Sequence, residues 1–360
     1  MFDFAPEGSG NPNDTKNRAG DCANPAANRA KIVDSIESAR GTPLMIVVSK
    51  GQHVVIGLGN VGRSLAEQLV ADGADVTVLT RAAPQIRVPG ATHVVGNLGN
   101  LRELWRKVPQ ASVIYNCANP PYQHWSREWP HLTRAINAFA QSAGAVLATT
   151  SNLYGYGPAA SPMKETLPLR ATFRNGRARV LSWQETLELH RKGHLRVTEV
   201  RASDYICAGS QSRMGDRVVP RVLSGKNVQL LGKVDTPHSW TFPADVARAL
   251  IAAANDERGW GRAWHVPSNP PKTQAQVVDD IADVAGVKRV KASTVPRGAL
   301  RLASLGNPVI RELRETDYQF AKPFILDSSA MSSTFGLEPS PWDDGLANLV
   351  DYYVRLQKKA

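Results

Sequence analysis

Three glycines, Gly57, Gly59 and Gly62, form the pattern Gly-x-Gly-x-x-Gly within the segment GLGNVG. Each position has its own physical task. Gly57 permits a tight turn, Gly59 lets the backbone approach a pyrophosphate, and Gly62 lets a helix pack closely on a strand. The N–H groups and the positive dipole at the start of that helix attract phosphate. Because the motif follows an apolar run and opens a helical pattern, it predicts a dinucleotide site that includes Asn60 and Val61.

The end of the second expected strand bears on the choice between NAD and NADP. An acidic residue about twenty positions after the glycines would bind the 2′-hydroxyl of the ribose. Here the strand ends Leu79-Thr80-Arg81, without a carboxylate. An Arg suits a 2′-phosphate because it forms bidentate, charge-assisted hydrogen bonds. We therefore expect NADP(H). In the alternative, Arg81 is a solvated surface residue and NAD(H) also binds.

Alternating strand and helix patterns must position these residues. Short apolar strands are expected at 53–57, 75–79, 93–95, 111–115 and 145–149, with helical spacing between most of them. Strands this apolar, joined by helices of about ten or more residues, form a parallel sheet that is covered on both faces. The fold class is therefore α/β, a doubly wound parallel sheet of the Rossmann type. The more mixed second half predicts a smaller, interleaved C-terminal substrate domain.

The expected boundaries interleave two domains. Residues 45–205 and 236–268 are assigned to the dinucleotide-binding domain, and residues 206–235 and 269–360 to the substrate domain. Residues 1–44 are rich in Asn, Gly, Pro and Ala and contain few large apolar side chains. Such a segment cannot offset its ordering entropy by burial. We therefore expect a disordered N-terminal extension there.

The composition excludes several classes of protein. Of 360 residues, 42% are apolar and 21% are charged, which is typical of globular chains and unlike collagen, mucins or mainly disordered proteins. The 43 Lys and Arg against 32 Asp and Glu give a net charge of +11, which favours anionic partners such as phosphorylated small molecules. Because the basic residues form no block and no basic–aromatic pattern, we expect no nucleic-acid partner.

The cysteines and histidines exclude further classes of site. Cys22, Cys117 and Cys207 are far apart and odd in number, which excludes a disulfide framework and fits a reducing compartment. His190 and His194 have the spacing of a metal pair, but no further ligand completes a set, so no metal is expected. No apolar run approaches the ~18 residues that a bilayer requires, and no secretory signal is present. We therefore expect a cytoplasmic protein with no membrane partner.

Five further segments follow the glycine motif in order along the chain. They are NCAN at 116–119, TTSNLYG at 149–155, RASDY at 201–205, HSWTFPAD at 238–245 and WHVP at 264–267. From about Gln52 to the C-terminus, the chain resembles the extended short-chain dehydrogenases/reductases, the NAD(P)-dependent epimerase/dehydratase group. The resemblance implies an oxidoreductase or an epimerase/dehydratase-like enzyme. Its small-molecule substrate would be a carbonyl or hydroxyl compound or be like a nucleotide sugar.

The resemblance also implies roles for individual residues. Asn97 and Leu98 stand where the family places an Asp and an apolar residue against the adenine. Ala118 and Asn119 would line the ribose and the pyrophosphate. Thr150 matches the Ser or Thr that hydrogen-bonds the substrate oxygen. Family members often dimerise through the helices after the fourth and fifth strands, so a homodimer is among the arrangements that the resemblance implies.

The proton-transfer residues depart from the family pattern. The family has a Tyr, and a Lys four residues on, about 25 residues after the catalytic Ser or Thr. The Lys lowers the pKa of the phenol and holds the nicotinamide ribose. The segment FRNGRARVLSWQE at 173–185 contains neither. Tyr154 is a candidate replacement, and Arg177 and Arg179 either contact ribose or phosphate or lie on an exposed helix face. The alternative function is a catalytically inactive NADP-binding regulator or redox sensor.

Candidate substrate residues follow from the expected architecture. Tyr122, His124 and Trp125 come after the fourth strand, at the carboxyl edge of the sheet where ligands bind. They either stack on or hydrogen-bond a substrate, or they pack the loop among themselves. Arg213, Arg217 and His238 either bind an anionic group of the substrate or are solvated at the surface.

Overall fold

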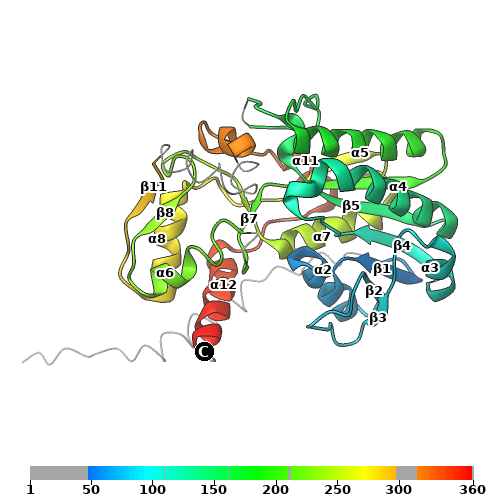
Figure 1. Cartoon of the computed structure of the whole chain (residues 1–360), viewed down its shortest axis with the longest axis horizontal. Coiled ribbons are helices and arrows are strands. Elements are labelled where there is room, and N and C mark those ends of the chain that lie inside the picture. Colours follow the sequence, from blue (N-terminus) through cyan, green and yellow to red (C-terminus); the bar gives the residue numbers. More distant parts are fainter. Residues whose placement is uncertain (1–47, 109, 161, 210–211, 297–313, 359–360) are drawn as a thin grey trace, which may run out of the picture. The chain divides into compact units, whose positions relative to one another are not determined.

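Seven parallel strands form the central sheet, in the order β10-β6-β5-β4-β1-β2-β3. The structure is a computed structural model that describes residues 48–108, 110–160, 162–209, 212–296 and 314–358 (Figure 1). The extension expected at 1–44 lies outside the described residues. The strands are β1 (Gln52–Ile56), β2 (Asp75–Thr80), β3 (Thr92–Val95), β4 (Ala111–Asn116), β5 (Val146–Asn152), β6 (Arg196–Ala202) and β10 (Arg262–His265).

The strand order reverses beside β1, which places a crevice at the sheet's carboxyl edge. β1 pairs with β2 on one side and with β4 on the other, and both pairs are parallel. Loops that leave the carboxyl ends of β1 and β4 diverge to opposite faces, which is where open α/β sheets bind ligands. The doubly wound parallel sheet predicted from the sequence is therefore confirmed, and its crevice lies next to the glycine motif.

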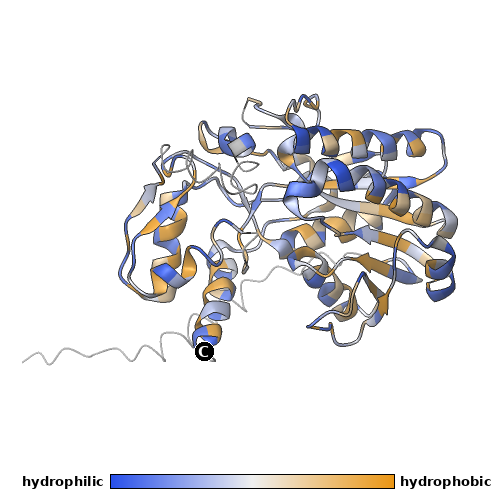
Figure 2. Ribbon diagram, viewed as in Figure 1, coloured by the Kyte–Doolittle hydropathy of each residue, from blue (hydrophilic) through white to orange (hydrophobic). Residues whose placement is uncertain are grey.

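Helices cover both faces of the sheet. On one face α2 (Asn60–Ala71) and α7 (Pro243–Ala254) pack together over a core that includes Val55, Leu65 and Trp264. On the other face α3 (Leu101–Lys107), α4 (Trp125–Ala143) and α5 (Arg174–Arg191) cover a second core that includes Ile114 and Phe139. Figure 2 shows hydrophilic and hydrophobic residues on the same helices, as expected of amphipathic helices that cover a core.

A separate hydrophobic core forms in the second half of the chain. Met214, Val222, Ile281 and Leu346 belong to it. Its elements are α6 (Val219–Leu223), β8 (Val228–Leu230), α8 (Gln274–Ala285), β11 (Ala292–Thr294) and α12 (Trp342–Gln357). The helix α11 (Ser329–Phe335) packs instead against the sheet core. The segment 269–360, which the sequence assigns to the substrate domain, therefore contributes to both cores.

Two short pairings continue the chain beyond the sheet. β7 (Asp204–Tyr205) follows β6 almost directly and pairs with β9 (Trp240–Thr241). Short 3-10 helices stand at Tyr122–His124, Leu153–Tyr156, Glu257–Gly259 and Arg314–Phe320. Three of these segments, β7 and the first two 3-10 helices, begin within about six residues after a sheet strand. They therefore bring side chains to the carboxyl edge of the sheet.

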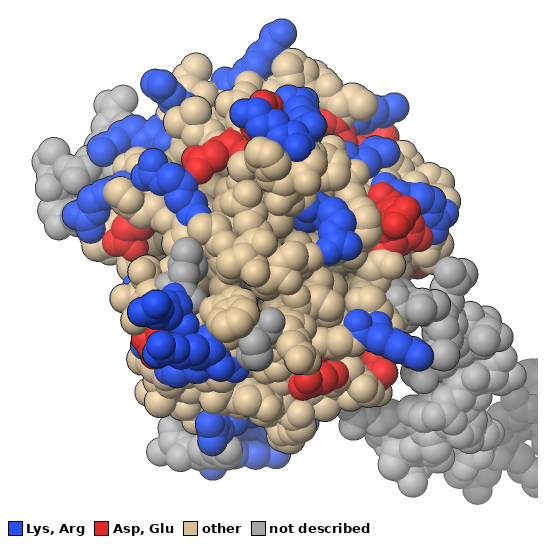
Figure 3. Space-filling view, turned by 90° about the vertical axis from the view of Figure 1, so that its right-hand side faces the viewer, with Lys and Arg blue, Asp and Glu red and all other residues tan. Residues whose placement is uncertain are grey.

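Surface charge is mixed on the face that Figure 3 shows. Lys and Arg side chains stand there among Asp and Glu side chains, without forming one continuous basic face. Within the described ranges, no helix has both the length and the apolar character needed to cross a bilayer.

Candidate functional site

The glycine motif forms the turn between β1 and α2. Gly57 has a φ of 91°, and its N–H donates to the Leu79 carbonyl at 2.9 Å. A Cβ at Gly57 would lie 2.9 Å from the Ala118 Cα, and one at Gly62 would lie 2.0 Å from the Gly57 oxygen. A Cβ at Gly59 would meet no atom within 4 Å. Two of the glycines are therefore required by contacts within the protein, whereas Gly59 faces open space.

The start of α2 is suited to hold an anion. Gly59 is its N-cap residue and supplies no side-chain cap, so the first N–H groups of the helix stay available. Val61 is buried in the sheet core. The Asn60 side-chain amide donates to Cys207 Sγ at 3.1 Å and to the Ala208 carbonyl at 3.0 Å. The segment after β7 is thereby tied to the glycine turn.

The residues predicted to bind the adenosine half lie after the next strands. Arg81 is exposed directly after β2. Asn97 follows β3 and accepts a hydrogen bond from the Gly99 N–H at 2.9 Å, and Leu98 packs against a core cluster. Ala118 and Asn119, which is exposed, follow β4. The structure thus brings the predicted cofactor residues to the carboxyl ends of β1 to β4.

Thr150 lies on β5, where it pairs with Val200 of β6. Its hydroxyl oxygen, Oγ1, is buried and has no hydrogen-bond partner of good geometry among the described residues. Its carbonyl oxygen accepts a hydrogen bond from Arg179 Nη2 at 2.9 Å. An unsatisfied buried hydroxyl costs about 1–3 kcal/mol, so it calls for an explanation such as a bound ligand.

Two buried polar side chains of α5, those of Asn175 and Arg179, form hydrogen bonds with the segment after β4 and with β5. Asn175 is buried and donates to the Tyr122 carbonyl at 3.3 Å. Arg179 is only 5% exposed, and its guanidinium lies 4.1 Å from the centre of the Trp129 ring. Burial lowers the pKa of Arg179, and the neighbouring Glu199 carboxylate opposes that change. The alternative that both helix arginines are exposed therefore holds for Arg177 alone.

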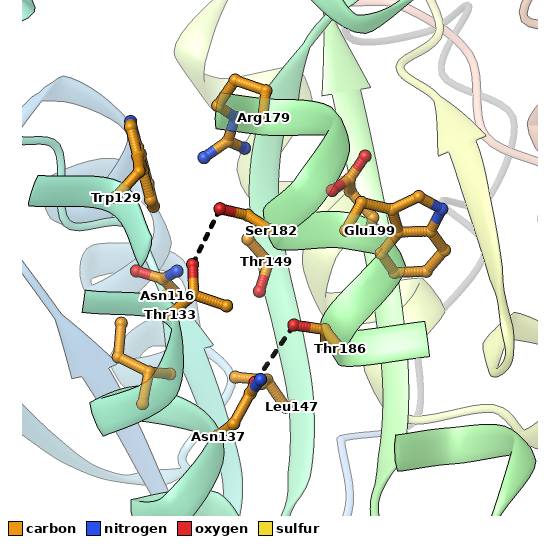
Figure 4. A pocket seen from close by; sticks show the side chains of 12 residues that line it. Asn116, Trp129, Thr133, Asn137, Leu147, Thr149, Arg179, Ser182, Thr186 and Glu199 are labelled. Carbon is orange, nitrogen blue, oxygen red and sulfur yellow. Dashed lines mark hydrogen bonds between the residues drawn. The ribbon is translucent and has the colours of Figure 1, made fainter. Parts of the chain in front are cut away.

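A small polar pocket surrounds Arg179 between α4, α5 and the sheet (Figure 4). Within it, Thr133 donates to Ser182 at 2.9 Å and Thr186 donates to Asn137 at 3.1 Å. It leaves about 20 Å³ that water can enter, which is enough for about one molecule. The pocket therefore solvates a buried charge and is too small for a substrate. Its lining residues are Asn116, Trp129, Thr133, Ile136, Asn137, Leu147, Thr149, Arg179, Ser182, Trp183, Thr186 and Glu199.

Tyr154 lies in an aromatic cluster. Its ring centre is 5.9 Å from those of Trp125 and Phe173 and 6.4 Å from that of Tyr122. Burial raises the pKa of Tyr154 well above its ordinary value, and Tyr122 and the Asp204 carboxylate raise it further. Its phenol is therefore neutral near neutral pH and can donate a proton but cannot readily accept one.

Two other predicted substrate residues pack the loop after β4. Trp125 is buried, and its ring N–H donates to the Pro120 carbonyl at 3.0 Å. His124 Nδ1 lies 3.2 Å from Glu128. Both side chains thus have partners within their own segment, as in the loop-packing alternative.

Arg213 and His238 converge on Asp204. His238 is fully buried; its Nε2 lies 2.9 Å from Asp204 Oδ2, and its ring stacks on Phe320 at 4.2 Å. Arg213 Nε lies 4.0 Å from Asp204 Oδ1. Although burial alone would raise the pKa of Asp204, its hydrogen bond to His238 and the charges of His238 and Arg213 lower that pKa. Of the two expected alternatives for these residues, solvation at the surface does not describe the buried His238.

Sequence reasoning missed Asp204 and Tyr205 as candidate site residues. Burial raises the pKa of Tyr205 to about 12, whereas the nearby Thr150 hydroxyl and the Arg179 charge act to lower it. The two hydroxyls thus lie near each other without forming a hydrogen bond of good geometry. A signal was present, because both residues directly follow β6, a strand that neighbours β5.

No metal site is evident in the described part of the chain. No group of three or more His, Cys, Asp or Glu side chains there could hold an ion. His190, at the end of α5, has its Nδ1 3.1 Å from the Leu195 carbonyl oxygen.

Comparison with known proteins agrees with this geometry. The model of the NAD dependent epimerase/dehydratase family matches residues 54–266, from β1 to the residue that follows β10. The chain belongs to this family. The matched range contains the glycine turn, Thr150, α5 and β7, so the family assignment covers the whole candidate site. No curated protein matches the sequence.

Several solved structures share the fold. An epimerase from Methanothermobacter thermautotrophicus is 14% identical, with a TM-score of 0.71 over 87% of this chain and 95% of that one. UDP-glucose 4-epimerase from Thermotoga maritima, solved with UDP-glucose, is 16% identical, with a TM-score of 0.68 over 85% and 99%. dTDP-glucose 4,6-dehydratase from Streptomyces venezuelae, solved with NAD, is 19% identical, with a TM-score of 0.67 over 86% and 98%.

Proposed function

We propose that this family member is an oxidoreductase that uses NADP(H) in preference to NAD(H). It would act on a small carbonyl or hydroxyl compound whose oxygen binds at Thr150. The observation that carries the proposal is the buried Thr150 hydroxyl at the carboxyl end of β5, which lies near the Tyr205 phenol and makes no hydrogen bond of good geometry within the described residues. A substrate oxygen would satisfy this hydroxyl, and a donor so placed stabilises negative charge that develops on the substrate.

The residues of the cofactor edge fit a nicotinamide dinucleotide. The open space at Gly59 and the uncapped start of α2 suit a pyrophosphate. When bound, the dinucleotide would supply or accept a hydride. Arg81 is exposed and has no acidic partner among the described residues, which suits a 2′-phosphate. The remaining residues that would hold it are Asn60, Val61, Asn97, Leu98, Ala118 and Asn119.

The substrate edge favours a small carbonyl or hydroxyl compound over a nucleotide sugar. A nucleotide diphosphate needs cations that are free to bind it. Of the three side chains expected for that task, Arg213 and His238 already contact the Asp204 carboxylate, whereas Arg217 is exposed. Tyr122 and Tyr154 supply aromatic surface instead. An uncharged substrate with a planar or apolar part therefore suits these side chains better than a diphosphate does.

The test is hydride transfer by the full-length chain. NADPH or NADH is mixed with carbonyl probes, namely phenanthrenequinone, benzil and aliphatic aldehydes, and the loss of nicotinamide absorbance is followed. In the opposite direction, NADP⁺ is mixed with UDP-glucose, dTDP-glucose or simple secondary alcohols. We expect turnover on a carbonyl probe with NADPH. NADPH binding without turnover on any probe would contradict the proposal.

That contrary result would favour the second candidate, a cofactor-binding regulator or redox sensor. The observation in its favour is the absence of Tyr and Lys from residues 173–185. Of the α5 side chains, Asn175 donates to the Tyr122 carbonyl and Arg179 donates to the Thr150 carbonyl. An amide does not transfer protons, and a guanidinium stays protonated. A regulator would keep the dinucleotide edge without a means of proton transfer.

A further inference from the structure

Tyr205 occupies a distinctive place at the carboxyl edge of the sheet. β5 and β6 are paired in parallel, with Thr150 opposite Val200 and Asn152 opposite Ala202. The chain leaves β6 at Ala202 and reaches Tyr205 three residues later, in β7. Neighbouring parallel strands end on the same edge, so the topology places Tyr205 at the same edge of the sheet as Thr150.

The surroundings of the Tyr205 hydroxyl form a defined cluster, which we call the donor cluster: Thr150, Arg179 and Tyr205. The Thr150 hydroxyl and the Arg179 guanidinium are both near enough to influence the phenol. Arg179 is itself fixed by its hydrogen bond to the Thr150 carbonyl at 2.9 Å. The Tyr205 side chain is half-buried and packs against the sheet core. A hydroxyl, a phenol and a fixed positive charge are thus held together at one point.

The segment that carries Tyr205 also touches the dinucleotide edge. Two and three residues after Tyr205, Cys207 and Ala208 accept hydrogen bonds from the Asn60 amide at 3.1 and 3.0 Å. Asn60 is the first residue of α2 and directly follows Gly59. Residues 205–208 therefore contact both the Thr150 end of the site and the glycine turn.

Tyr154 lacks this placement. Its ring contacts Trp125 and Phe173, and the groups that act on its phenol are Tyr122, Asp204, Arg213 and Tyr318. Neither Thr150 nor Arg179 is among these described neighbours. The phenol that accompanies Thr150 is therefore that of Tyr205, although Tyr154 is closer to Thr150 in sequence.

We propose that Tyr205 is the proton donor of this site, and that the donor cluster is built to reduce a carbonyl group. The inference rests on the proposed function, because it needs a substrate oxygen at Thr150. The carbonyl carbon accepts a hydride, and with it two electrons, from the reduced nicotinamide dinucleotide. The C=O π bond breaks, and its oxygen takes the proton from the Tyr205 hydroxyl. The resulting phenolate is stabilised by the Arg179 charge and regains a proton from solvent.

The protonation state of Tyr205 agrees with a donor role. Burial raises its pKa to about 12; Cys117 and Cys207 also raise it, and Thr150 and Arg179 lower it. The phenol is therefore neutral near pH 7, where it can donate a proton but cannot act as a base. Reduction uses this neutral form, whereas alcohol oxidation and base-initiated epimerisation would need the scarce phenolate.

The first test compares three tyrosine variants in the NADPH-dependent reduction of phenanthrenequinone. Tyr205→Phe should lower turnover by about 10²-fold or more, the usual contribution of a general acid, with little change in NADPH affinity. Tyr352→Phe is the matched control, because Tyr352 is 49% exposed on α12, outside the site. A large loss in Tyr154→Phe together with full activity in Tyr205→Phe would overturn the inference.

The pH dependence of turnover gives a second readout. Because Tyr205 stays protonated, reduction should be nearly constant between about pH 6 and pH 9, whereas oxidation of the product alcohol should rise about tenfold per pH unit. A reduction rate that falls with a midpoint inside this range would assign the donor role to another group and overturn the inference.

A third readout does not depend on activity. In protein labelled with ring-¹³C tyrosine, the signal assigned through Tyr205→Phe should titrate well above the ordinary phenol value. Arg179→Met should raise its midpoint further, because it removes a positive charge. An ordinary midpoint that does not respond to Arg179→Met would overturn the donor cluster itself. Failure of the wild type to turn over any carbonyl would instead overturn the proposed function and the donor role with it.

Discussion

Two regions of the candidate site differ in how closely they match the family pattern. One is the dinucleotide edge, which consists of the glycine turn and the ends of β2 to β4, and the other is the α5 edge, where α5 lies beside the end of β5. At the dinucleotide edge, each glycine of the motif has a physical reason: Gly57 and Gly62 would clash with backbone atoms if they carried a Cβ, and Gly59 faces open space. At the α5 edge, Asn175 and Arg179 stand at the sequence positions where the family resemblance implies a Tyr and a Lys, and Arg179 donates to the Thr150 carbonyl. The backbone geometry of the glycine turn suits a dinucleotide, whereas residues 173–185 contain neither Tyr nor Lys.

The comparison shows which parts of a site the fold itself supports. A phosphate is held by N–H groups and a helix dipole, which follow from backbone geometry once the turn has formed. A proton donor depends on one side chain with the right pKa. Any strand end around the same crevice can supply it. β7 offers such a place beside β5, and Tyr205 stands there.

Removal of the Thr150 hydroxyl is the strongest test of this contrast. Thr150→Val keeps the shape of the side chain but deletes the donor to the substrate oxygen. Loss of one such donor typically lowers turnover by ~10²–10³-fold, and we expect at least tenfold here. NADPH affinity should hardly change, because the dinucleotide edge is untouched. Steady-state kinetics and a fluorescence titration with NADPH measure the two effects separately.

Thr92→Val is the matched control for this variant. Thr92 is exposed at the start of β3, at the opposite end of the strand from the carboxyl edge. The Thr92→Val variant should keep wild-type turnover. If Thr150→Val also kept full turnover, the motif around Thr150 would be structural, and the regulator hypothesis would become the better account.

Removal of the Arg81 charge tests the dinucleotide edge alone. If Arg81 binds the 2′-phosphate, Arg81→Ala should weaken NADPH binding by roughly 10- to 150-fold, the usual range for hydrogen bonds to charged groups. NADH has no 2′-phosphate, so its affinity should stay the same. Isothermal titration of both cofactors with both proteins gives the comparison. Equal affinities of the wild type for NADPH and NADH would contradict the assignment.

The fold was predictable from the sequence because its signals are local. The apolar runs and the glycine motif predict the strands, the helix α2 and the parallel sheet, and the family model agrees. The start of α4 was harder to predict from the sequence. The helix begins at Trp125 and contains Pro130, a residue type that usually interrupts a helical pattern. Burial of Trp125 and Trp129 stabilises these first turns, and burial of this kind depends on tertiary contacts.

The placement of the predicted cofactor residues at the strand ends follows from local patterns for the same reason, whereas the contacts around Thr150 do not. Gly59 and Arg81 belong to patterns within one βαβ unit. Tyr205 is 55 positions from Thr150, and only the pairing of β5 with β6 brings them together. The engagement of His238 by Asp204 likewise depends on a distant strand pairing, between β7 and β9. Neither relation has a fixed spacing that a sequence pattern could show.

Two glycine variants separate folding from binding within the turn. A Cβ at Gly62 would lie 2.0 Å from the Gly57 oxygen, so Gly62→Ala should lower the free energy of unfolding by about 1–3 kcal/mol through overpacking. Gly59→Ala meets no protein atom and should change stability by less than about 1 kcal/mol. Its methyl group would nevertheless obstruct a pyrophosphate, so NADPH affinity should fall by about tenfold or more.

Urea unfolding and NADPH titration of both variants distinguish the two roles. Similar stability losses in both would show that Gly59 is also a packing position.

The smallest expected effect concerns the substrate edge and acid. The pKa of Asp204 is lowered in the folded protein by His238 and Arg213, despite its burial. A carboxylate with a lowered pKa contributes stability above its unfolded pKa, near 4, and that contribution disappears as the pH falls through the lower, folded value. Asp204→Asn has no such group. The wild type should therefore melt a few degrees above Asp204→Asn at neutral pH, and the difference should shrink below about pH 4. Thermal melts of both proteins across this range measure the difference.

Asp216→Asn serves as the control, because Asp216 accepts a hydrogen bond from Tyr353 at 2.6 Å, outside this cluster. A difference that stays constant into acid would mean that Asp204 is not stabilised as a carboxylate. His238 and Arg213 would then be free to bind an anionic substrate, and the preference for an uncharged one would lose its support.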